Sequence, residues 1–259
     1  MRGTDELVPV PIPRGVPEEL GIAGPKAQWL WEQIGDSGDE VHRIVEPGRP
    51  DRFLKTSIRP AEGRMANERD RMAWLKGKLP IPEVLGYAVA GGKEWLVTAA
   101  VPGHSACHPY LSMPRDAVVR EMARWLRRIH SLPKAGCPFV RRLDEKIADA
   151  AASAKRRSGE ERERLARFLA LPRPAEDLVV VHGDYCEPNI IFAGAEVAGF
   201  IDLGFAGVSD RYSDFCQAAY SLNRNGDGAL TGFFFAEYGP PALDEAKLEY
   251  YMELEGWLG

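Results

Sequence analysis

Apolar and polar positions alternate in short runs over the first hundred residues, as is typical of β-strands. Val41–Val45 alternates in this way, and a Pro-Gly turn leads into a second run at Arg52–Lys55. Two more runs, Val84–Val89 and Glu94–Ala100, are separated by a Gly-Gly pair. The pattern therefore predicts a sheet built from hairpins in this part of the chain.

One helix is expected inside this strand-rich region, over residues 62–78. Met65, Glu68, Met72 and Leu75 recur at steps of three and four, which places them on one helix face. Because an unpaired carboxylate on an apolar face would be costly, Glu68 is expected to have a partner.

The remainder of the chain is predicted to be mainly helical. An apolar strand at 177–181 and a short hairpin at 190–192 and 198–201 interrupt this helical texture. The expected helical stretches are residues 115–131, 143–170, a segment beginning near 213, and 243–258.

The sequence pattern changes from strand-like to helical near Val101-Pro102-Gly103, which predicts two lobes. We expect an N-terminal nucleotide-binding lobe over 1–98, a hinge over 99–103, and a C-terminal catalytic and substrate-binding lobe over 104–259. The proline-containing stretch before residue 25 is expected to form an extended arm.

The composition excludes several function classes. The 33 basic and 38 acidic residues give a net charge of −5, which argues against a general nucleic-acid binder. No apolar run suits a signal peptide or a membrane span, so we expect a cytoplasmic protein without a membrane partner. The isolated cysteines are expected to be reduced packing residues: Cys107, Cys137, Cys186 and Cys216.

The strongest chemical signal is His-Gly-Asp-Tyr-Cys-Glu-Pro-Asn at 182–189, followed by Phe-Ile-Asp-Leu-Gly at 200–204. Asp184, Asn189 and Asp202 are the residue types that phosphoryl transfer needs. One carboxylate accepts the proton of an alcohol, and an amide oxygen with a second carboxylate holds Mg²⁺ against phosphates. The alternative is a turn-rich hairpin in which Asp and Asn only cap and turn.

With these motifs the chain resembles the aminoglycoside phosphotransferases, antibiotic kinases that share the protein-kinase fold. Their 3′- and 3″-type members are the most similar. The resemblance implies an α+β, bilobal protein-kinase-like fold with an antiparallel N-lobe sheet and a mainly helical C-lobe. Further segments carry the resemblance: residues 68–75, 95–97, 101–103, 130–132, 137–139 and 207–212.

The resemblance also implies roles for individual residues. Asp184 would be the catalytic base, and Asn189 and Asp202 would hold Mg²⁺. Lys55, paired with Glu68, would bind the α- and β-phosphates of ATP or GTP.

Four further residues would contact the nucleotide. Ser37 would lie in a loop over the β-phosphate, and Phe53 would stack on the base or, alternatively, pack in the core. The Ala99 carbonyl and the Val101 amide would bind the edge of the base.

Two further residues, one inside the motif and one after it, are expected to be structural. His182 is interpreted as a structural residue of the catalytic loop rather than as a base. Asp214 is expected to anchor that loop from a helix.

The sequence departs from the family where the antibiotic would bind. Between Arg141 and Arg167 nine residues are basic and six are acidic, although carboxylates are expected to surround a polycation. Asp210, Glu253 and Glu255 remain candidate substrate carboxylates, and Asp210 is alternatively a loop brace.

These departures leave the acceptor open. The expected function is an antibiotic O-phosphotransferase acting on an aminoglycoside-like acceptor. A kinase of a less cationic sugar-bearing antibiotic, such as a capuramycin-type nucleoside, and a nucleotide-binding pseudokinase remain the alternatives. A protein kinase is excluded because the Ala-Pro-Glu motif and an activation segment are missing.

Overall fold

The computed structural model describes residues 8–22, 24–32, 39–59 and 62–258. By its internal contacts the chain divides into two compact units. The first contains residues up to His104 together with Ile191–Ala193 and Val197–Gly204, and the second contains the rest. The hinge expected over 99–103 stays a prediction.

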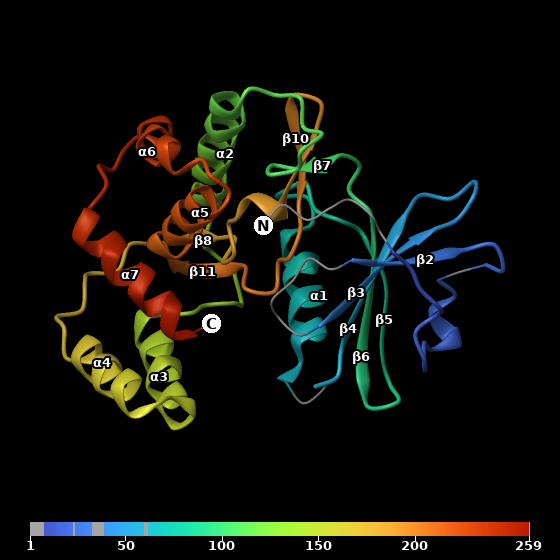
Figure 1. Ribbon diagram of the computed structural model, residues 1–259, viewed down its shortest axis with the longest axis horizontal. Coiled ribbons are helices and arrows are strands. Elements are labelled where there is room, and N and C mark those ends of the chain that lie inside the picture. The colour runs from blue at the N-terminus through green and yellow to red at the C-terminus, as the bar shows by residue number, and fades with distance from the viewer. Residues whose placement is uncertain (1–7, 23, 33–38, 60–61, 259) are drawn as a thin grey trace. The chain divides into compact units, whose positions relative to one another are not determined.

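The first unit is built on an antiparallel sheet with the strand order β1-β2-β3-β4-β6-β5 (Figure 1). The hairpins expected from the alternating pattern are confirmed, and β1 and β2 extend the sheet at one edge. The strands are β1 (Val8–Pro9), β2 (Gln28–Glu32), β3 (Glu40–Val45), β4 (Arg52–Ser57), β5 (Val84–Ala90) and β6 (Lys93–Ala99).

The two faces of this sheet carry different residues. Leu54 on β4 is fully buried in a core with Ile44, Trp95 and Val97. Because side chains alternate along a strand, Phe53 and Lys55 lie on the opposite face.

Helix α1 (Arg64–Leu75) contacts β4, β5 and β6. Met65, Glu68, Met72 and Leu75 are all buried, as their spacing predicts. The helix is shorter than expected because Gly63 precedes it with a left-handed φ of 61° and Lys76 leaves helical geometry.

The second unit is mainly helical, as expected. Strand β8 (Leu178–Val181) pairs with β11 (Gly207–Asp210) in this unit. The helices of the second unit are α2 (Arg115–His130), α3 (Leu143–Ser153), α4 (Gly159–Leu169), α5 (Tyr212–Arg224), α6 (Thr231–Tyr238) and α7 (Glu245–Leu258). The remaining sheet, with the order β10-β9-β7, belongs mostly to the first unit and is formed by β7 (His104–Ser105), β9 (Ile190–Ala193) and β10 (Glu196–Phe200).

The single helical stretch expected over 143–170 is wrong in one respect, since it is two helices. Ser158 breaks it by capping α4: its hydroxyl accepts a hydrogen bond from the Glu161 N–H, and the Glu161 carboxylate accepts one from the Ser158 N–H. This reciprocal capping box stabilises a new helix start.

Helix α5 lies at the centre of the second unit, in contact with α6 and α7 (Figure 1). Phe215 and Leu222 on α5 are buried, as is Tyr251 on α7. On α2, Met122 and Ile129 are buried as predicted, whereas Trp125 is only half-buried and lies under the Arg128 guanidinium. This core fixes the start of α5, which carries Asp214.

No helix in the described part of the chain is long and apolar enough to cross a membrane. All four cysteines are free thiols, as expected.

Candidate active site

The His-Gly-Asp motif begins where β8 ends, next to β11. Gly183 has a φ of +86°, and a Cβ there would lie 2.3 Å from the backbone oxygen of Phe205. The loop therefore needs a residue that tolerates a left-handed conformation and carries no side chain. Gly183 sets the path that presents the next residue, Asp184.

Asp214 anchors this loop from the first turn of α5, which confirms its expected role. Its carboxylate oxygens accept hydrogen bonds from the His182 N–H at 2.8 Å and the Gly183 N–H at 2.7 Å. His130 Nε2 lies 3.1 Å from the same carboxylate. Burial raises the pKa of Asp214, but the His130 contact and the loop N–H groups outweigh it, so its pKa lies below the ordinary value.

Asp184 itself is half-buried and oriented by its neighbours. The Asn189 amide donates to the Asp184 carboxylate at 2.9 Å and to its backbone oxygen at 3.1 Å. His182 Nδ1 accepts a hydrogen bond from the Asp184 N–H at 3.3 Å, a contact that fits the structural role expected of this histidine. Contacts within the motif thus hold both the backbone and the carboxylate of Asp184 in place.

A second carboxylate inside the motif, Glu187, was missed by the sequence analysis. It is fully buried and ion-paired with Arg115, which also binds Asp227. Its other oxygen accepts a hydrogen bond from the Asn225 amide at 2.7 Å. Burial raises the pKa of Glu187 despite these partners. Because the partners lie up to 72 residues away, no local sequence pattern reveals this brace.

Lys55 and Glu68 form the ion pair that the family resemblance implies, with Nζ 2.7 Å from Oε1. The two side chains are only 14% and 7% exposed. Lys55 also pairs with Asp202, which has a φ of 59° and is half-exposed. Burial lowers the pKa of Lys55, but the two carboxylates outweigh it and raise the pKa above its ordinary value.

Three of the remaining candidate nucleotide residues are described, and all three belong to the first unit. Phe53 is half-buried and paired with Thr98 of β6, on the same face of β4 as Lys55. Ala99 ends β6, its N–H bonded to the Glu83 oxygen, and Val101 follows two residues later. The fourth of these candidates, Ser37, lies outside the described residues.

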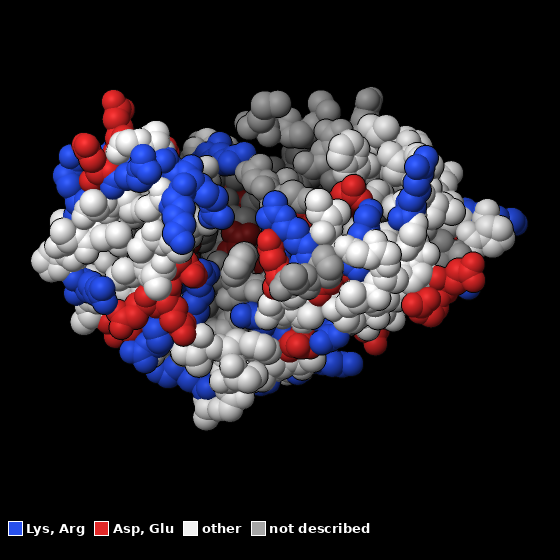
Figure 2. Space-filling model, turned by 90° about the horizontal axis from the view of Figure 1, so that it is seen from below, with Lys and Arg blue, Asp and Glu red and all other residues white. Residues whose placement is uncertain are grey.

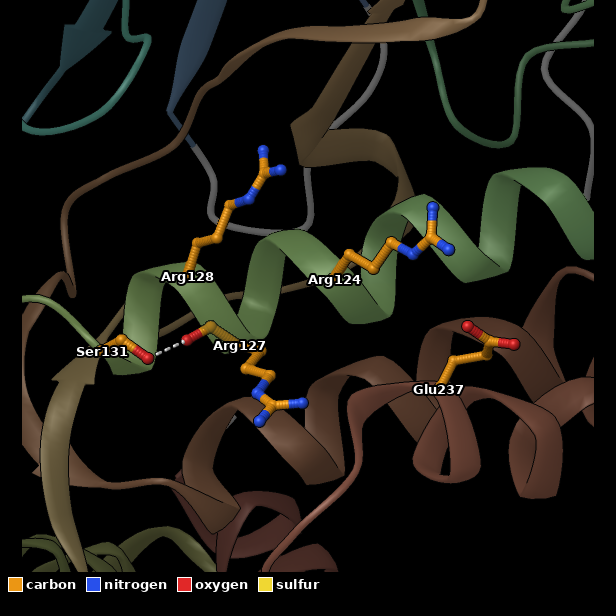
Figure 3. Close-up of a pocket in the computed structure, with 5 residues that line it drawn as sticks. All are labelled: Arg124, Arg127, Arg128, Ser131 and Glu237. Atoms are coloured by element: carbon orange, nitrogen blue, oxygen red, sulfur yellow. Dashed lines mark hydrogen bonds between the residues drawn. The ribbon is translucent and has the colours of Figure 1, made fainter.

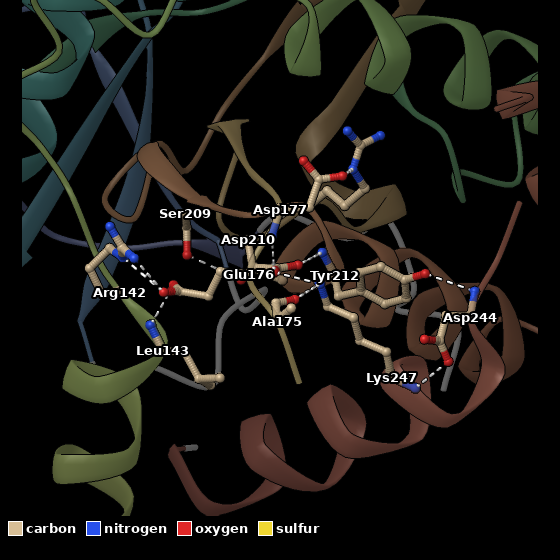
Figure 4. Close-up of polar contacts among 12 residues, drawn as sticks. Arg142, Leu143, Ala175, Glu176, Asp177, Ser209, Asp210, Tyr212, Asp244 and Lys247 are labelled. Atoms are coloured by element: carbon tan, nitrogen blue, oxygen red, sulfur yellow. Dashed lines mark hydrogen bonds and ion pairs between the residues drawn. The ribbon is translucent and has the colours of Figure 1, made fainter. Parts of the chain in front are cut away.

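Asp210 corrects one expectation, because it is 1% exposed and its oxygens already have partners (Figure 4). Lys247 Nζ on α7 lies 2.7 Å from Oδ2, which also accepts the Asp177 N–H, and Oδ1 accepts the Tyr212 N–H. A substrate group cannot reach a carboxylate buried in this way. Of the two roles considered, loop brace is the one that fits.

Glu253 and Glu255, the other two candidate substrate carboxylates, differ in their surroundings. Glu253 is exposed. Glu255 is ion-paired with Lys146 of α3.

Four of the nine basic residues in the run after residue 140 are paired with acidic side chains. Basic and acidic side chains lie interspersed on the surface shown in Figure 2. The ion pairs are Arg141–Asp149, Arg142–Glu176, Lys146–Glu255 and Arg157–Glu161. The excess of basic residues counted in the sequence therefore overstates the local positive field.

The donor chemistry of the motif suits a hard cation. Asn189 and Asp202 offer amide and carboxylate oxygens, which Mg²⁺ prefers. Among the described residues there is no group of three or more His, Cys, Asp or Glu side chains placed to hold a metal.

A shallow hollow of about 500 Å³ lies elsewhere in the second unit, between α2 and α6 (Figure 3). Arg124, Arg127 and Arg128 of α2 and Glu237 of α6 are among the residues that line it. None of the motif residues lines it.

Comparison with known proteins gives a consistent result. The phosphotransferase enzyme family matches residues 31–251. The aminoglycoside 3′-phosphotransferase of Niallia circulans is 36% identical over 254 residues, covering 93% of this chain and 97% of its own. The expected family resemblance is thereby confirmed.

Solved structures support the same conclusion. A type VIII aminoglycoside 3′-phosphotransferase superposes with a TM-score of 0.79 at 31% identity, covering 90% of this chain and 94% of that one. An aminoglycoside phosphotransferase of Streptomyces rimosus, in complex with ADP and streptomycin, gives 0.70 at 30% identity, with coverages of 88% and 92%. The expected α+β fold class is confirmed.

Proposed function

Because the chain belongs to the phosphotransferase enzyme family, we propose that it transfers the γ-phosphoryl group of a nucleoside triphosphate to a hydroxyl of an aminoglycoside-type antibiotic. Relatives that match almost the whole chain carry this activity in their names. One solved relative holds both ADP and streptomycin. We place the reaction in the cytoplasm, where nucleoside triphosphates are available.

The observation that carries the proposal is the double support of Asp184. Asp214 fixes the backbone before it, and the Asn189 amide holds its carboxylate. In our proposal the carboxylate orients the acceptor hydroxyl and takes its proton as the phosphoryl group arrives. A rigidly placed base suits a reaction in which the enzyme contributes mostly positioning and charge stabilisation.

Lys55 is our candidate for binding the nucleotide phosphates. Its ammonium is held by Glu68, and its raised pKa keeps it charged at neutral pH. We propose that Asp202 and Asn189 bind Mg²⁺, which would neutralise charge on the phosphates. On nucleotide binding, the Asp202 oxygen now bonded to Lys55 would be released to the metal.

The base of the nucleotide is proposed to lie against the face of β4 that carries Phe53. The Ala99 carbonyl and the Val101 amide would then bind its edge, and residues 99–103 would serve as the hinge. Ser37 keeps its proposed place near the β-phosphate. Backbone groups of this kind can select adenine or guanine, so both ATP and GTP are candidate donors.

The proposal is tested by incubating the protein with Mg-ATP or Mg-GTP and single antibiotics. The panel contains kanamycin, streptomycin and a capuramycin-type nucleoside, with Asp184→Ala as the control. We expect a mass increase corresponding to one phosphoryl group on at least one aminoglycoside. Phosphorylation of the nucleoside alone would favour the less cationic alternative, and nucleotide binding without any product would favour a pseudokinase.

A further inference from the structure

Lys146 is a buried cation whose two partners come from other helices of the second unit. Its Nζ lies 2.9 Å from the Ser213 hydroxyl on α5 and 2.5 Å from Glu255 Oε1 on α7. The lysine side chain is 6% exposed and the glutamate side chain 20% exposed. An ion pair this little exposed is weakly screened by salt, so the lysine neutralises most of the glutamate charge.

The Lys146–Glu255 pair is connected to the catalytic loop through two neighbouring residues of α5, Ser213 and Asp214. Ser213 immediately precedes Asp214, whose carboxylate binds the two backbone N–H groups before Asp184. Lys146 and Glu255 also both act on the pKa of Cys216, one turn further along α5. The pair therefore lies next to Asp214, the residue that anchors the loop of the proposed base.

The same arrangement occurs a second time in this unit. Asp210, another candidate substrate carboxylate, is bonded to Lys247. Two of the three carboxylates that the sequence offers for an ammonium group thus carry a lysine of the same chain instead. Of these three, Glu253 is the one left exposed.

We propose that Lys146 is a specificity-determining residue of the acceptor site. It occupies Glu255 as an internal counter-ion and thereby selects against strongly cationic acceptors in favour of those with fewer ammonium groups. The inference rests on the proposed function, because Glu255 matters for specificity only if an antibiotic binds beside it. The site would then discriminate against strongly cationic acceptors in two ways: Glu255 is not available to bind an ammonium group, and the charge of Lys146 repels one.

A purely structural role for Lys146 makes a different prediction. Removing a structural ion pair would lower stability and activity for every acceptor alike. Removing a counter-ion would instead lower the KM of a polycation and leave kcat almost unchanged, because only binding shared by the ground state and the transition state would improve. The KM-against-kcat split therefore separates the two roles.

The test compares kanamycin kinetics and calorimetric kanamycin binding at low and physiological salt. We expect Lys146→Met to lower the KM and Kd about tenfold at low salt, with kcat within about twofold, and the gain to shrink with added salt. Lys146→Arg should behave as the unaltered protein. Lys155→Met is the matched control, since it removes the same charge from an exposed position of the same unit.

Glu255→Gln completes a double-mutant cycle and provides a second test in case Lys146→Met does not fold. Alone, it should change the kanamycin KM less than about twofold, because Lys146 already neutralises Glu255; in its presence Lys146→Met should bring no gain. Thermal melting verifies that each variant is folded. If Lys146→Met does not fold, a strong loss of kanamycin binding in Glu255→Gln alone overturns the proposal.

Three other outcomes would also overturn it. These are an equal KM shift in Lys155→Met, a shift that persists beside Glu255→Gln, and no shift in a folded Lys146→Met. Failure of the proposed function looks different, since the unaltered protein would then phosphorylate no antibiotic of the panel. Calorimetric binding of kanamycin still decides the role of Lys146 in that case.

Discussion

The ammonium of Lys55 lies 2.7 Å from the carboxylate of Glu68, although one residue belongs to a strand and the other to a helix. The strand alternation of β4 turns Lys55 away from the apolar core, and the helical spacing of α1 buries Glu68 on its packed face. Each side chain would be costly to bury alone. Together they fix a charged group in a defined place.

This pair leads to the first prediction. Lys55→Met should lower kcat/KM for the nucleotide by about 10²–10³, because one charge-stabilising donor to the phosphates is removed. Glu68→Gln should act in the same direction but less strongly, since the positive charge of Lys55 is kept and only its partner Glu68 is neutralised. Steady-state kinetics with varied nucleotide measure both effects. Lys76→Ala, at an exposed position just after α1, is the control; full activity of Lys55→Met would contradict the assignment.

The second prediction concerns Asp184. Asp184→Ala should lower kcat by about 10²–10⁴ while nucleotide affinity stays similar, because the carboxylate acts on the acceptor proton and not on the nucleotide. Turnover is measured by product mass and nucleotide affinity by calorimetry. Near-normal turnover of the variant would rule Asp184 out as the base.

Asp202 should respond differently, which is the third prediction. In Asp202→Asn we expect a loss of kcat together with weaker nucleotide binding, and the loss of affinity should appear only when Mg²⁺ is present. Titrations with and without EDTA separate the metal-dependent part. An equal loss in both conditions would show that Asp202 supports the nucleotide through Lys55 alone.

The fourth prediction is a pH dependence of stability at Asp214. Its pKa is lowered in the folded protein, so its stabilising contribution is present above the ordinary Asp value of about 3.9 and is lost as the pH falls through the folded value. Asp214→Asn should cost about 2–4 kcal/mol at pH 7, because its NH₂ group would face a backbone N–H.

This stability difference is measured by urea unfolding of both proteins between pH 7 and pH 3. The gap between them should be widest above about pH 5 and should narrow below about pH 4. A gap that stays constant over this range would show that the Asp214 carboxylate does not titrate differently in the folded protein.

The fifth prediction compares Gly183 and Gly194, two glycines that both have a positive φ. Gly183→Ala should lower both stability and activity, because its Cβ would meet the Phe205 oxygen at 2.3 Å. Gly194 also has a positive φ, but no atom lies within 4 Å of the place that a Cβ would take there. Gly194→Ala should therefore cost only about 1–2 kcal/mol of left-handed strain. The clash at Gly183 should add about 1–3 kcal/mol to this in urea unfolding; equal losses would contradict the role assigned to Gly183.

Local patterns in the sequence were enough to predict most of the elements and the chemistry-bearing residues. Alternation and the three-four spacing depend only on neighbouring residues, so β4, α1 and the inward position of Glu68 could be predicted. The break at Ser158 was missed although its capping box is local, because the charged helical texture continues across it.

Only the tertiary structure decided which charges meet. Glu187 with Arg115, Asp210 with Lys247, and Glu255 with Lys146 pair residues 37 to 109 positions apart. Such pairs follow from how helices pack, and in the sequence each of these carboxylates looks the same as a solvated one. The sequence therefore determined what kind of reaction the chain's motifs suit, whereas packing decided which carboxylates are left for a substrate.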